Sequence, residues 1–290
     1  ELTDMWNEPK NPQDFSFDFN RLWREEAEAM VKKDYNHPSV LLYSTGNEIP
    51  EIGRTSGAVH HRQIAQAIRE LDPTRFTTCG INGMLAISDQ IREMAGRYQE
   101  PQPAVESGGG SEGLNQLMGQ SEQERTDSLS VCQPLTERLN ATVASLDVAG
   151  YNYLTARHTL EHTLQPDRVV VGSETFPPEI PRLWKIVEEN PHVIGDFTWT
   201  GWDYLGEAGI GIYHYGDGEE WHGQGRYPDR LAYCGDSTLN AYRRPVSYLR
   251  EIAYGLREKP FLAVVRMDRQ GLPYDRNNWK YEDALDTWTF

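Results

Sequence analysis

Two glutamates, each following a run of apolar residues, carry the strongest chemical signal in this 290-residue chain. The first run, residues 39–44, leads to Asn47 and Glu48, and the second, residues 168–172, leads to Glu174. An acid just past the carboxyl end of a buried strand stands where barrel enzymes keep their catalytic groups. Hydrolysis of a glycosidic bond needs two carboxyl groups that flank the bond. Glu48 and Glu174 therefore predict a glycosidase site.

The surroundings of the two acids indicate different roles. The apolar strand before Glu48 removes water from its carboxyl group and favours the protonated form, as a general acid needs, while Asn47 can bind a sugar hydroxyl. Gly172 leaves room beside Glu174, whose hydroxyl neighbours would keep the carboxylate ionised as a nucleophile. The alternative interpretation makes Glu48 a helix cap and Glu174 a solvated loop acid.

A tyrosine is expected to support the nucleophile. Residues 148–153 are a predicted strand, in which Tyr151 and Tyr153 share one face and Asn152 lies on the other. Tyr153 is therefore a candidate hydrogen-bond donor to Glu174. The alternative is that both tyrosines fill the core.

Aromatic and acidic residues also follow the last predicted strand. Within residues 197–207, Trp199 and Trp202 could carry a sugar ring on an indole face, and Asp203 could accept two sugar hydroxyls. The alternative places Trp199 in the core and makes Asp203 a loop cap.

Composition narrows the choice of ligand. The formal net charge of −16 argues against nucleic acid or an anionic membrane surface as a partner, because these are bound through clustered Lys and Arg. Eight Trp and 15 Tyr suit a carbohydrate ligand. Three widely spaced cysteines and scattered histidines indicate neither a disulfide framework nor a metal site, and no apolar run reaches the ~20 residues of a membrane span.

Predicted strands and helices alternate along the chain, which favours parallel pairing and an α/β fold. The strands are apolar throughout rather than alternating, as expected when both faces of a sheet are covered. The predicted strands are residues 39–44, 75–79, 148–153, 168–172 and 193–199, and the predicted helices are residues 18–33, 56–71, 84–97, 157–164 and 180–189.

Three stretches depart from this alternation. Residues 98–140, rich in Gly, Ser, Glu and Gln, are expected to form a flexible insertion over the barrel face. Residues 1–6 are expected to be the end of a strand, as in a piece of a longer protein. Residues 259–290 are expected to be an extension toward a further module, which leaves residues 1–258 as the catalytic barrel.

Four motifs taken together resemble the catalytic TIM barrel of glycoside hydrolase family 2, which includes β-galactosidases, β-glucuronidases and β-mannosidases. The motifs are residues 36–39, 46–48, 172–176 and 197–204, in family order within residues 1–258. The resemblance implies a retaining mechanism without a cofactor. It makes Glu48 the acid/base, Glu174 the nucleophile and Tyr153 the hydrogen-bond partner of the nucleophile.

The same resemblance implies that the barrel is incomplete. Asp4 and Trp6 fall just after the third barrel strand and join the substrate-binding residues, so the first two strands and most of the third are missing. An open sheet of this kind exposes its edge. The expected protein partners are therefore a second copy of the chain or the missing N-terminal part.

The resemblance also bears on the sugar. The glucuronidase pattern has an Asn-x-Lys pair after the eighth strand, which residues 234–241 lack, and residues 278–280 lie too far downstream to replace it. Residues 202–206 are typical of galactosidase-like members. The prediction is retaining hydrolysis of terminal β-linked neutral sugars, most simply β-galactosides. The alternatives are another retaining barrel glycosidase, of mannosidase or cellulase type, and a silent carbohydrate-binding fragment.

Overall fold

The computed structural model describes residues 1–90, 123–215, 227–273, 278–281 and 283–286. The chain divides into two compact units. Of the described residues, the first comprises 1–90, 123–174 and 190–195, and the second comprises 175–189, 196–215, 227–273, 278–281 and 283–286.

A five-stranded sheet begins in the first unit. Its strands follow the order β1-β2-β3-β4-β5, and β1 to β4 pair in parallel. Parallel strands that alternate with helices confirm the predicted α/β class and form part of an α/β barrel. The strands are β1 (Leu42–Asn47), β2 (Phe76–Asn82), β3 (Val148–Asn152), β4 (Val169–Thr175) and β5 (Val193–Thr198).

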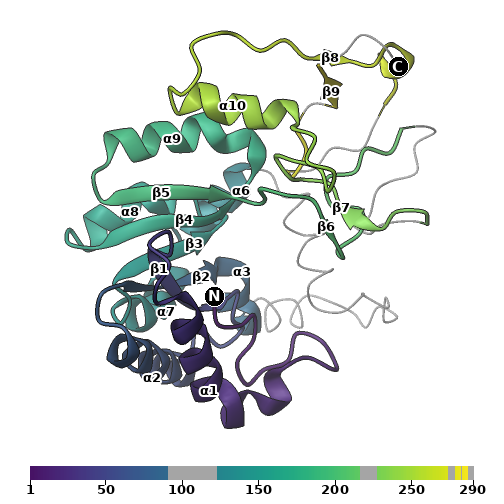
Figure 1. Ribbon diagram of the computed structural model, residues 1–290. Helices are drawn as coiled ribbons and strands as arrows, with labels where there is room; N and C mark the ends of the chain where they lie inside the picture. The colour runs from purple at the N-terminus through teal and green to yellow at the C-terminus, as the bar shows by residue number, and fades with distance from the viewer. Residues whose placement is uncertain (91–122, 216–226, 274–277, 282, 287–290) are drawn as a thin grey trace, which may run out of the picture. The chain divides into compact units, whose positions relative to one another are not determined.

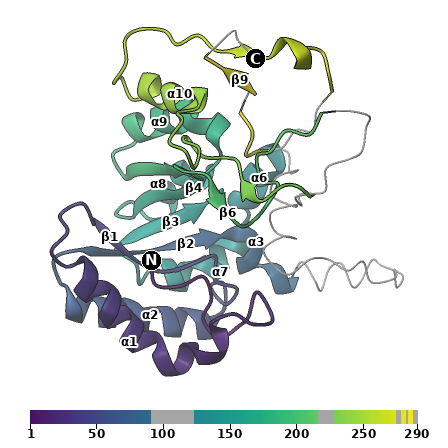
Figure 2. The same cartoon turned by 45° about the vertical axis from the view of Figure 1, so that its right-hand side comes forward.

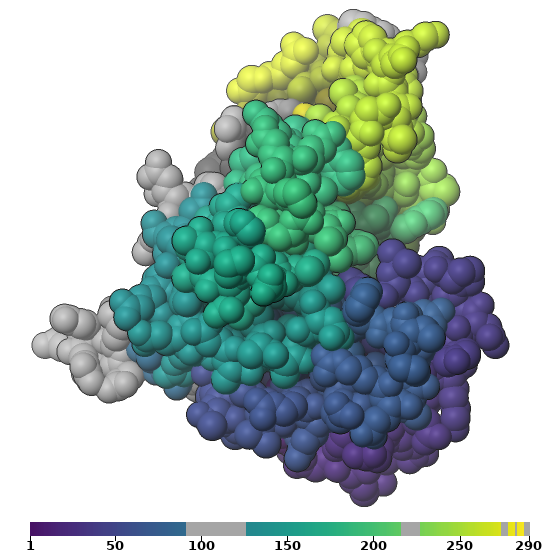
Figure 3. Space-filling model, turned by 90° about the vertical axis from the view of Figure 1, so that its left-hand side faces the viewer, coloured from purple at the N-terminus to yellow at the C-terminus, as the bar shows by residue number. Residues whose placement is uncertain are grey.

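Helices cover one face of this sheet. Helix α2 packs against β1 and β2 and lies between α1 and α7 (Figures 1 and 2). In the space-filling view the purple N-terminal residues and the blue residues of α2 lie side by side (Figure 3). The helices of this unit are α1 (Ser16–Asp34), α2 (Thr55–Leu71), α3 (Gly83–Ala86), α6 (Gln123–Ser130), α7 (Gln133–Val143) and α8 (Arg157–Leu164).

The hydrophobic core of the first unit lies between these helices and the sheet. Apolar side chains at helical spacing on α2 face the strands, and their burial drives the packing. Fully buried examples are Phe19, Ile64, Ile68, Ile81 and Leu139.

The N-terminal residues run beside the edge strand β1. The Leu2 N–H donates to the carbonyl of Ser44 at 2.9 Å, and the Asn47 N–H donates to the carbonyl of Thr3 at 2.9 Å. Residues 1–3 thus lie along β1 as a short strand-like segment without being part of a regular strand.

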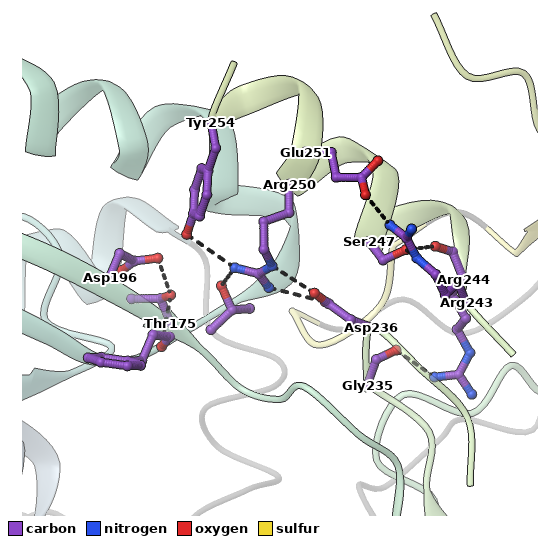
Figure 4. Close-up of polar contacts among 12 residues, drawn as sticks. Thr175, Asp196, Gly235, Asp236, Arg243, Arg244, Ser247, Arg250, Glu251 and Tyr254 are labelled. Carbon is purple, nitrogen blue, oxygen red and sulfur yellow. Dashed lines mark hydrogen bonds and ion pairs between the residues drawn. The ribbon is translucent and has the colours of Figure 1, made fainter. Parts of the chain in front are cut away.

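The second unit is built from short elements and arginine contacts. Trp184 of α9 and Tyr254 pack with ring centroids 4.0 Å apart. Arg250 of α10 donates to Asp236 and to the hydroxyl group of Tyr254 (Figure 4). The elements are a 3₁₀ turn (Pro177–Glu179), α9 (Ile180–Glu189), β6 (Tyr204–Leu205), β7 (Leu231–Ala232), α10 (Pro245–Ala253), β8 (Val264–Val265), a second 3₁₀ turn (Met267–Arg269) and β9 (Ala284–Leu285).

Part of the predicted flexible insertion is helical. Helices α6 and α7 begin inside residues 98–140, and α7 buries Leu135 and Leu139 on one face, so the expectation of a flexible segment was wrong there. Its charged composition reflects the outer face of α7 and hides the buried leucines. Residues 98–122 and most of the predicted helix 84–97 lie outside the described residues.

Over the described part of the chain, none of the helices combines the length and the apolar character of a membrane span. Within the same residues, no group of three or more His, Cys, Asp or Glu side chains is arranged to hold a metal ion. Cys79, Cys132 and Cys234 are free thiols.

Candidate active site

Glu48 directly follows β1 in a rarely populated backbone conformation. Its φ angle of +51° is in the left-handed region, which non-glycine residues seldom adopt, and its N–H donates to the carbonyl of Gly80 at 2.7 Å. Such strain is found preferentially at functional sites. Glu48 Oε1 accepts hydrogen bonds from Asn82 Nδ2 at 2.8 Å and from Asn152 Nδ2 at 3.2 Å.

Glu174 lies near the carboxyl end of β4 and meets the residue that follows β3. The hydroxyl group of Tyr153 donates to Glu174 Oε2 at 3.0 Å, and the Tyr153 N–H donates to the carbonyl of Glu174 at 2.8 Å. Tyr153 also has a left-handed φ angle, of +59°. The backbone conformation of Tyr153 thus turns its side chain toward the acid.

One amide joins the two carboxylates. Asn152 contacts Glu48 and also hydrogen-bonds Glu174, and its Nδ2 donates to Asn47 Oδ1 at 2.9 Å. Glu48 and Glu174 therefore lie within hydrogen-bonding reach of a single side chain. The two acids are thus candidates for the pair of carboxyl groups that hydrolysis of a glycosidic bond needs.

Gly80 on β2 makes room for this network. A Cβ atom at this position would lie 2.4 Å from Asn47 Oδ1 and 3.0 Å from Asn152 Oδ1. Any side chain here would displace both amides. The candidate site therefore requires glycine at position 80 of β2.

The pKa of Glu174 is raised well above its usual value. Burial is the main cause, the charge of Glu48 is the next, and the hydrogen bonds from Tyr153 and Asn152 act in the opposite direction. This raised pKa does not support the expectation that hydroxyl neighbours keep Glu174 ionised. Ser173 donates instead to Asn152 Oδ1 at 2.7 Å, and Thr175 donates to Asp196 Oδ2 at 3.0 Å (Figure 4).

The prediction that Tyr151 and Tyr153 share one face of a strand was also wrong. The pairing of β3 with β4 shifts register between Tyr151 and Asn152, and Tyr153 lies beyond the end of the strand. Because of this irregularity, the period of two does not extend to Tyr153. Tyr151 donates to Glu161 at 2.7 Å, while Tyr153 donates to Glu174.

Of the two predicted N-terminal contacts, Trp6 is a core residue. Trp6 is fully buried, with its Nε1 3.3 Å from the carbonyl of Thr45 and its ring against His60 and His61. It presents no face for a sugar, so its prediction as a substrate-binding residue was wrong. Asp4 is exposed and interacts with Glu1, and its role stays a prediction.

Asp203, in the second unit, is engaged by protein groups. The residue is 3% exposed, and its carboxylate forms a bidentate pair with Arg244 at 2.6 and 2.5 Å and accepts from the Gly235 N–H at 3.0 Å. The prediction that Asp203 accepts sugar hydroxyls was wrong, because these donors already occupy it. The alternative of a loop-fixing acid describes it better.

The two predicted indole platforms differ in their surroundings. Trp202 is 56% exposed. Trp199 is half-buried, and its Nε1 donates to the hydroxyl group of Tyr204 at 3.1 Å. Both roles in stacking stay predictions, as do the roles of Glu48, Glu174, Tyr153 and Asn47 and the expected protein partners.

Three contributors to the site were missed by the sequence analysis: Gly80, Asn82 and Asn152. Asn82 lies opposite Asn152, and Asn152 lies opposite Glu174, in neighbouring strands. A signal was available, because an Asn ends both β2 and β3 as Asn47 ends β1. Repetition of a polar residue at successive strand ends indicates that these residues meet at one edge of the sheet.

Replacing Glu174 by Gln is expected to stabilise the chain at neutral pH. The pKa of Glu174 is higher in the folded chain than its ordinary value of 4.5, so the folded state holds a proton that the unfolded state has lost. Stability from this group is complete below pH 4.5 and is lost as the pH rises through the folded pKa. In urea denaturation, the free energy of unfolding of Glu174→Gln should therefore exceed that of the wild type at pH 8 and equal it at pH 4.5.

Glu26→Gln, on the exposed face of α1, is the matched control and should show no such pH dependence. A Glu174→Gln advantage that is equally large at both pH values would contradict the pKa shift.

The parallel sheet forms part of an α/β barrel, and the two acids lie at the carboxyl ends of its strands. Residues 11–132 match the model of the family described as "Glycosyl hydrolases family 2, TIM barrel domain". This match confirms the resemblance to glycoside hydrolase family 2, which is a family of hydrolytic enzymes.

Individual relatives support the same family. A β-galactosidase of Bacteroides ovatus is 21% identical, over 100% of this chain and 34% of the relative. A candidate β-glucuronidase of Formosa agariphila is 24% identical, over 72% of this chain and 20% of the relative. A solved glycosyl hydrolase family 2 structure from Bacteroides cellulosilyticus has a TM-score of 0.68 at 29% identity, over 99% of this chain and 30% of that one. The chain thus spans between 20% and 34% of the length of these proteins.

Proposed function

We propose that this chain carries the catalytic acids of a retaining β-glycosidase that releases terminal neutral sugars, with β-galactosides as the first choice of substrate. The observation that supports the proposal best is the convergence of Glu48 and Glu174 on Asn152. The resemblance to glycoside hydrolase family 2 favours direct attack by one acid, as in a retaining enzyme, over the attack by water that an inverting enzyme uses.

In the proposed mechanism Glu174 attacks the anomeric carbon while Glu48 protonates the leaving oxygen. Water then cleaves the glycosyl-enzyme, with Glu48 as the base. Tyr153 holds Glu174 Oε2 in place through the 3.0 Å hydrogen bond. Burial and the charge of Glu48 raise the pKa of Glu174, so the site disfavours two ionised acids at once. The mechanism requires Glu174 to be ionised and the catalytic proton to be on Glu48.

Two features of residues 234–281 favour a neutral sugar. Residues 234–241 lack the Asn-x-Lys pair of the glucuronidase pattern. Lys280, from the downstream triplet, is 8% exposed and lies 5.1 Å from the ring centre of Tyr213. The ring of Tyr213 thus takes up one side of this ammonium group, which favours a neutral sugar over a uronic acid.

A panel of aryl glycosides tests the substrate on the full-length natural protein that carries this sequence. We expect the highest kcat/KM on the β-galactoside, at least about tenfold above the β-glucoside, β-mannoside and β-glucuronide, since a lost sugar hydroxyl contact leaves a site group unpaired. A 2-deoxy-2-fluoro galactoside should then label Glu174, as peptide mass mapping would show. Preference for the glucuronide, or a label on another residue, would contradict the proposal.

The silent-fragment alternative is separated by comparison with the 290-residue chain alone. Turnover by the full-length protein and none by the chain would show that these residues need the rest of the protein. Absence of turnover in both, on every glycoside of the panel, would favour a carbohydrate-binding role.

A further inference from the structure

We propose that Asn82 is a positioning residue that, together with Asn152, keeps Glu48 Oε1 as a hydrogen-bond acceptor and so confines the catalytic proton to Glu48 Oε2. The inference rests on the proposed function and adds a residue to it. Its basis is the 2.8 Å contact from Asn82 Nδ2 and the 3.2 Å contact from Asn152 Nδ2, which meet on one oxygen.

The amide oxygen of Asn82 fixes the orientation of the amide group. Asn82 is 1% exposed and is the N-cap of α3, where its Oδ1 accepts from the Met84 N–H at 2.9 Å. A backbone N–H can only donate, so the atom that faces it is the amide oxygen. The atom that faces Glu48 is therefore the Nδ2 group, which can only donate.

The second amide is oriented by the two acceptors that face its Nδ2 group. Asn152 is 1% exposed, and its Oδ1 lies 2.7 Å from the donating hydroxyl group of Ser173. Its Nδ2 faces Asn47 Oδ1 and Glu48 Oε1. The reversed amide would set one oxygen against two acceptors, which is unfavourable.

Two donors on Glu48 Oε1 use both lone pairs of that oxygen. A proton on Oε1 would point at one of the two N–H groups, so the proton must lie on Oε2. The network therefore decides which oxygen of the acid can reach a leaving group. Without Asn82 the carboxyl group can rotate, and misplacement by about 1 Å lowers a catalytic rate by up to ~100-fold.

The arrangement also separates Glu48 from Glu174. Asn152 Nδ2 carries two hydrogens and donates to Asn47 Oδ1 and Glu48 Oε1, while the Asn152 side chain also hydrogen-bonds Glu174, so this amide is shared among three residues. Asn82 contacts Glu48. In the sheet, Asn82 of β2 lies on one side of Asn152 and Glu174 of β4 lies on the other. Asn82 thus acts on the acid/base alone, and its loss should affect the steps that need proton transfer.

The test is Asn82→Ser in the full-length natural protein. Serine keeps a good N-cap for α3 but is too short to reach Glu48. We expect kcat/KM to fall at least about tenfold on an aryl glycoside with a poor leaving group and by less than about twofold on the 2,4-dinitrophenyl glycoside, whose departure needs no acid. The alkaline limb of the pH profile should move to higher pH, because a donor that favours the ionised acid is gone.

If Asn82 has a purely structural role, Asn82→Ser will lower kcat/KM equally on both substrates and leave the pH profile unchanged. That result would overturn the inference. Asn140→Ser, the same exchange on the exposed side of α7, should leave activity unchanged. If the wild type hydrolyses no glycoside, the proposed function fails. The inference is then judged by carboxyl ¹³C NMR, in which Asn82→Ser must move the titration of the signal that Glu48→Gln removes.

Discussion

Glu174→Ala is expected to abolish hydrolysis of every β-glycoside, whereas Glu48→Ala is expected to spare substrates that have very good leaving groups. Loss of the nucleophile removes the covalent step itself, with a fall in kcat on the order of 10⁴-fold or more. Loss of the acid removes only proton donation, worth about 10²–10⁴-fold on a poor leaving group and little on 2,4-dinitrophenolate. The measurement is kcat/KM for both variants on a series of aryl glycosides of increasing leaving-group pKa.

Azide provides a second, stereochemical measurement of the same roles. In Glu48→Ala, azide attacks the glycosyl-enzyme from the face opposite Glu174, and the product is the β-glycosyl azide. In Glu174→Ala, azide enters the space of the lost carboxylate and attacks the substrate directly, so the product is the α-glycosyl azide. The reverse pattern, or equal loss on the dinitrophenyl substrate, would show that the roles are assigned to the wrong acids.

The sheet could be predicted from the sequence because each strand is a local pattern. The apolar runs at 39–44 and 168–172 became β1 and β4 with small shifts of their ends, since burial on both faces requires continuous apolar residues. Helix α8 occupies the predicted residues 157–164. Helix α10 was not anticipated, because its apolar stripe is interrupted by Arg250 and preceded by two further arginines.

The candidate site was predictable only in part, because its geometry depends on the register between strands. The strand-end rule placed Glu48 and Glu174 at one edge of the sheet. The amides that join them come from β2 and β3, and their alignment depends on a register shift that no local pattern announces. Residue type alone was also misleading for Trp6 and Asp203, because an indole and a carboxylate can equally serve a core and an ion pair.

Glu161→Leu is expected to destabilise the chain by about 3–5 kcal/mol, the largest stability effect of a single substitution that we predict. Arg157 and Glu161 of α8 have fully buried side chains, with Nε and Oε1 2.6 Å apart. Arg168 also pairs with Glu161, and Tyr151 donates to it at 2.7 Å. Removing the acid leaves the buried guanidinium of Arg157 without its counterion, which costs far more than the intact pair contributes.

Urea denaturation of three variants measures this effect. The double variant Glu161→Leu with Arg157→Met should recover much of the loss, because an apolar pair replaces the unpaired charge. Glu189→Leu, at an exposed ion pair on α9, should change stability by less than about 1 kcal/mol. A double variant no more stable than Glu161→Leu would show that the guanidinium is not the source of the cost.

The hydrogen bond between Tyr151 and Glu161 is also expected to affect the candidate site. Tyr151 is fully buried and directly precedes Asn152 and Tyr153, so its hydrogen bond to Glu161 ties the end of β3 to α8. Tyr151→Phe removes this bond while keeping the ring and both charges. It should cost about 1 kcal/mol of stability and lower kcat more than it raises KM, because Asn152 and Tyr153 then hold the two acids less firmly. A change confined to stability would show that the anchoring of β3 does not depend on this contact.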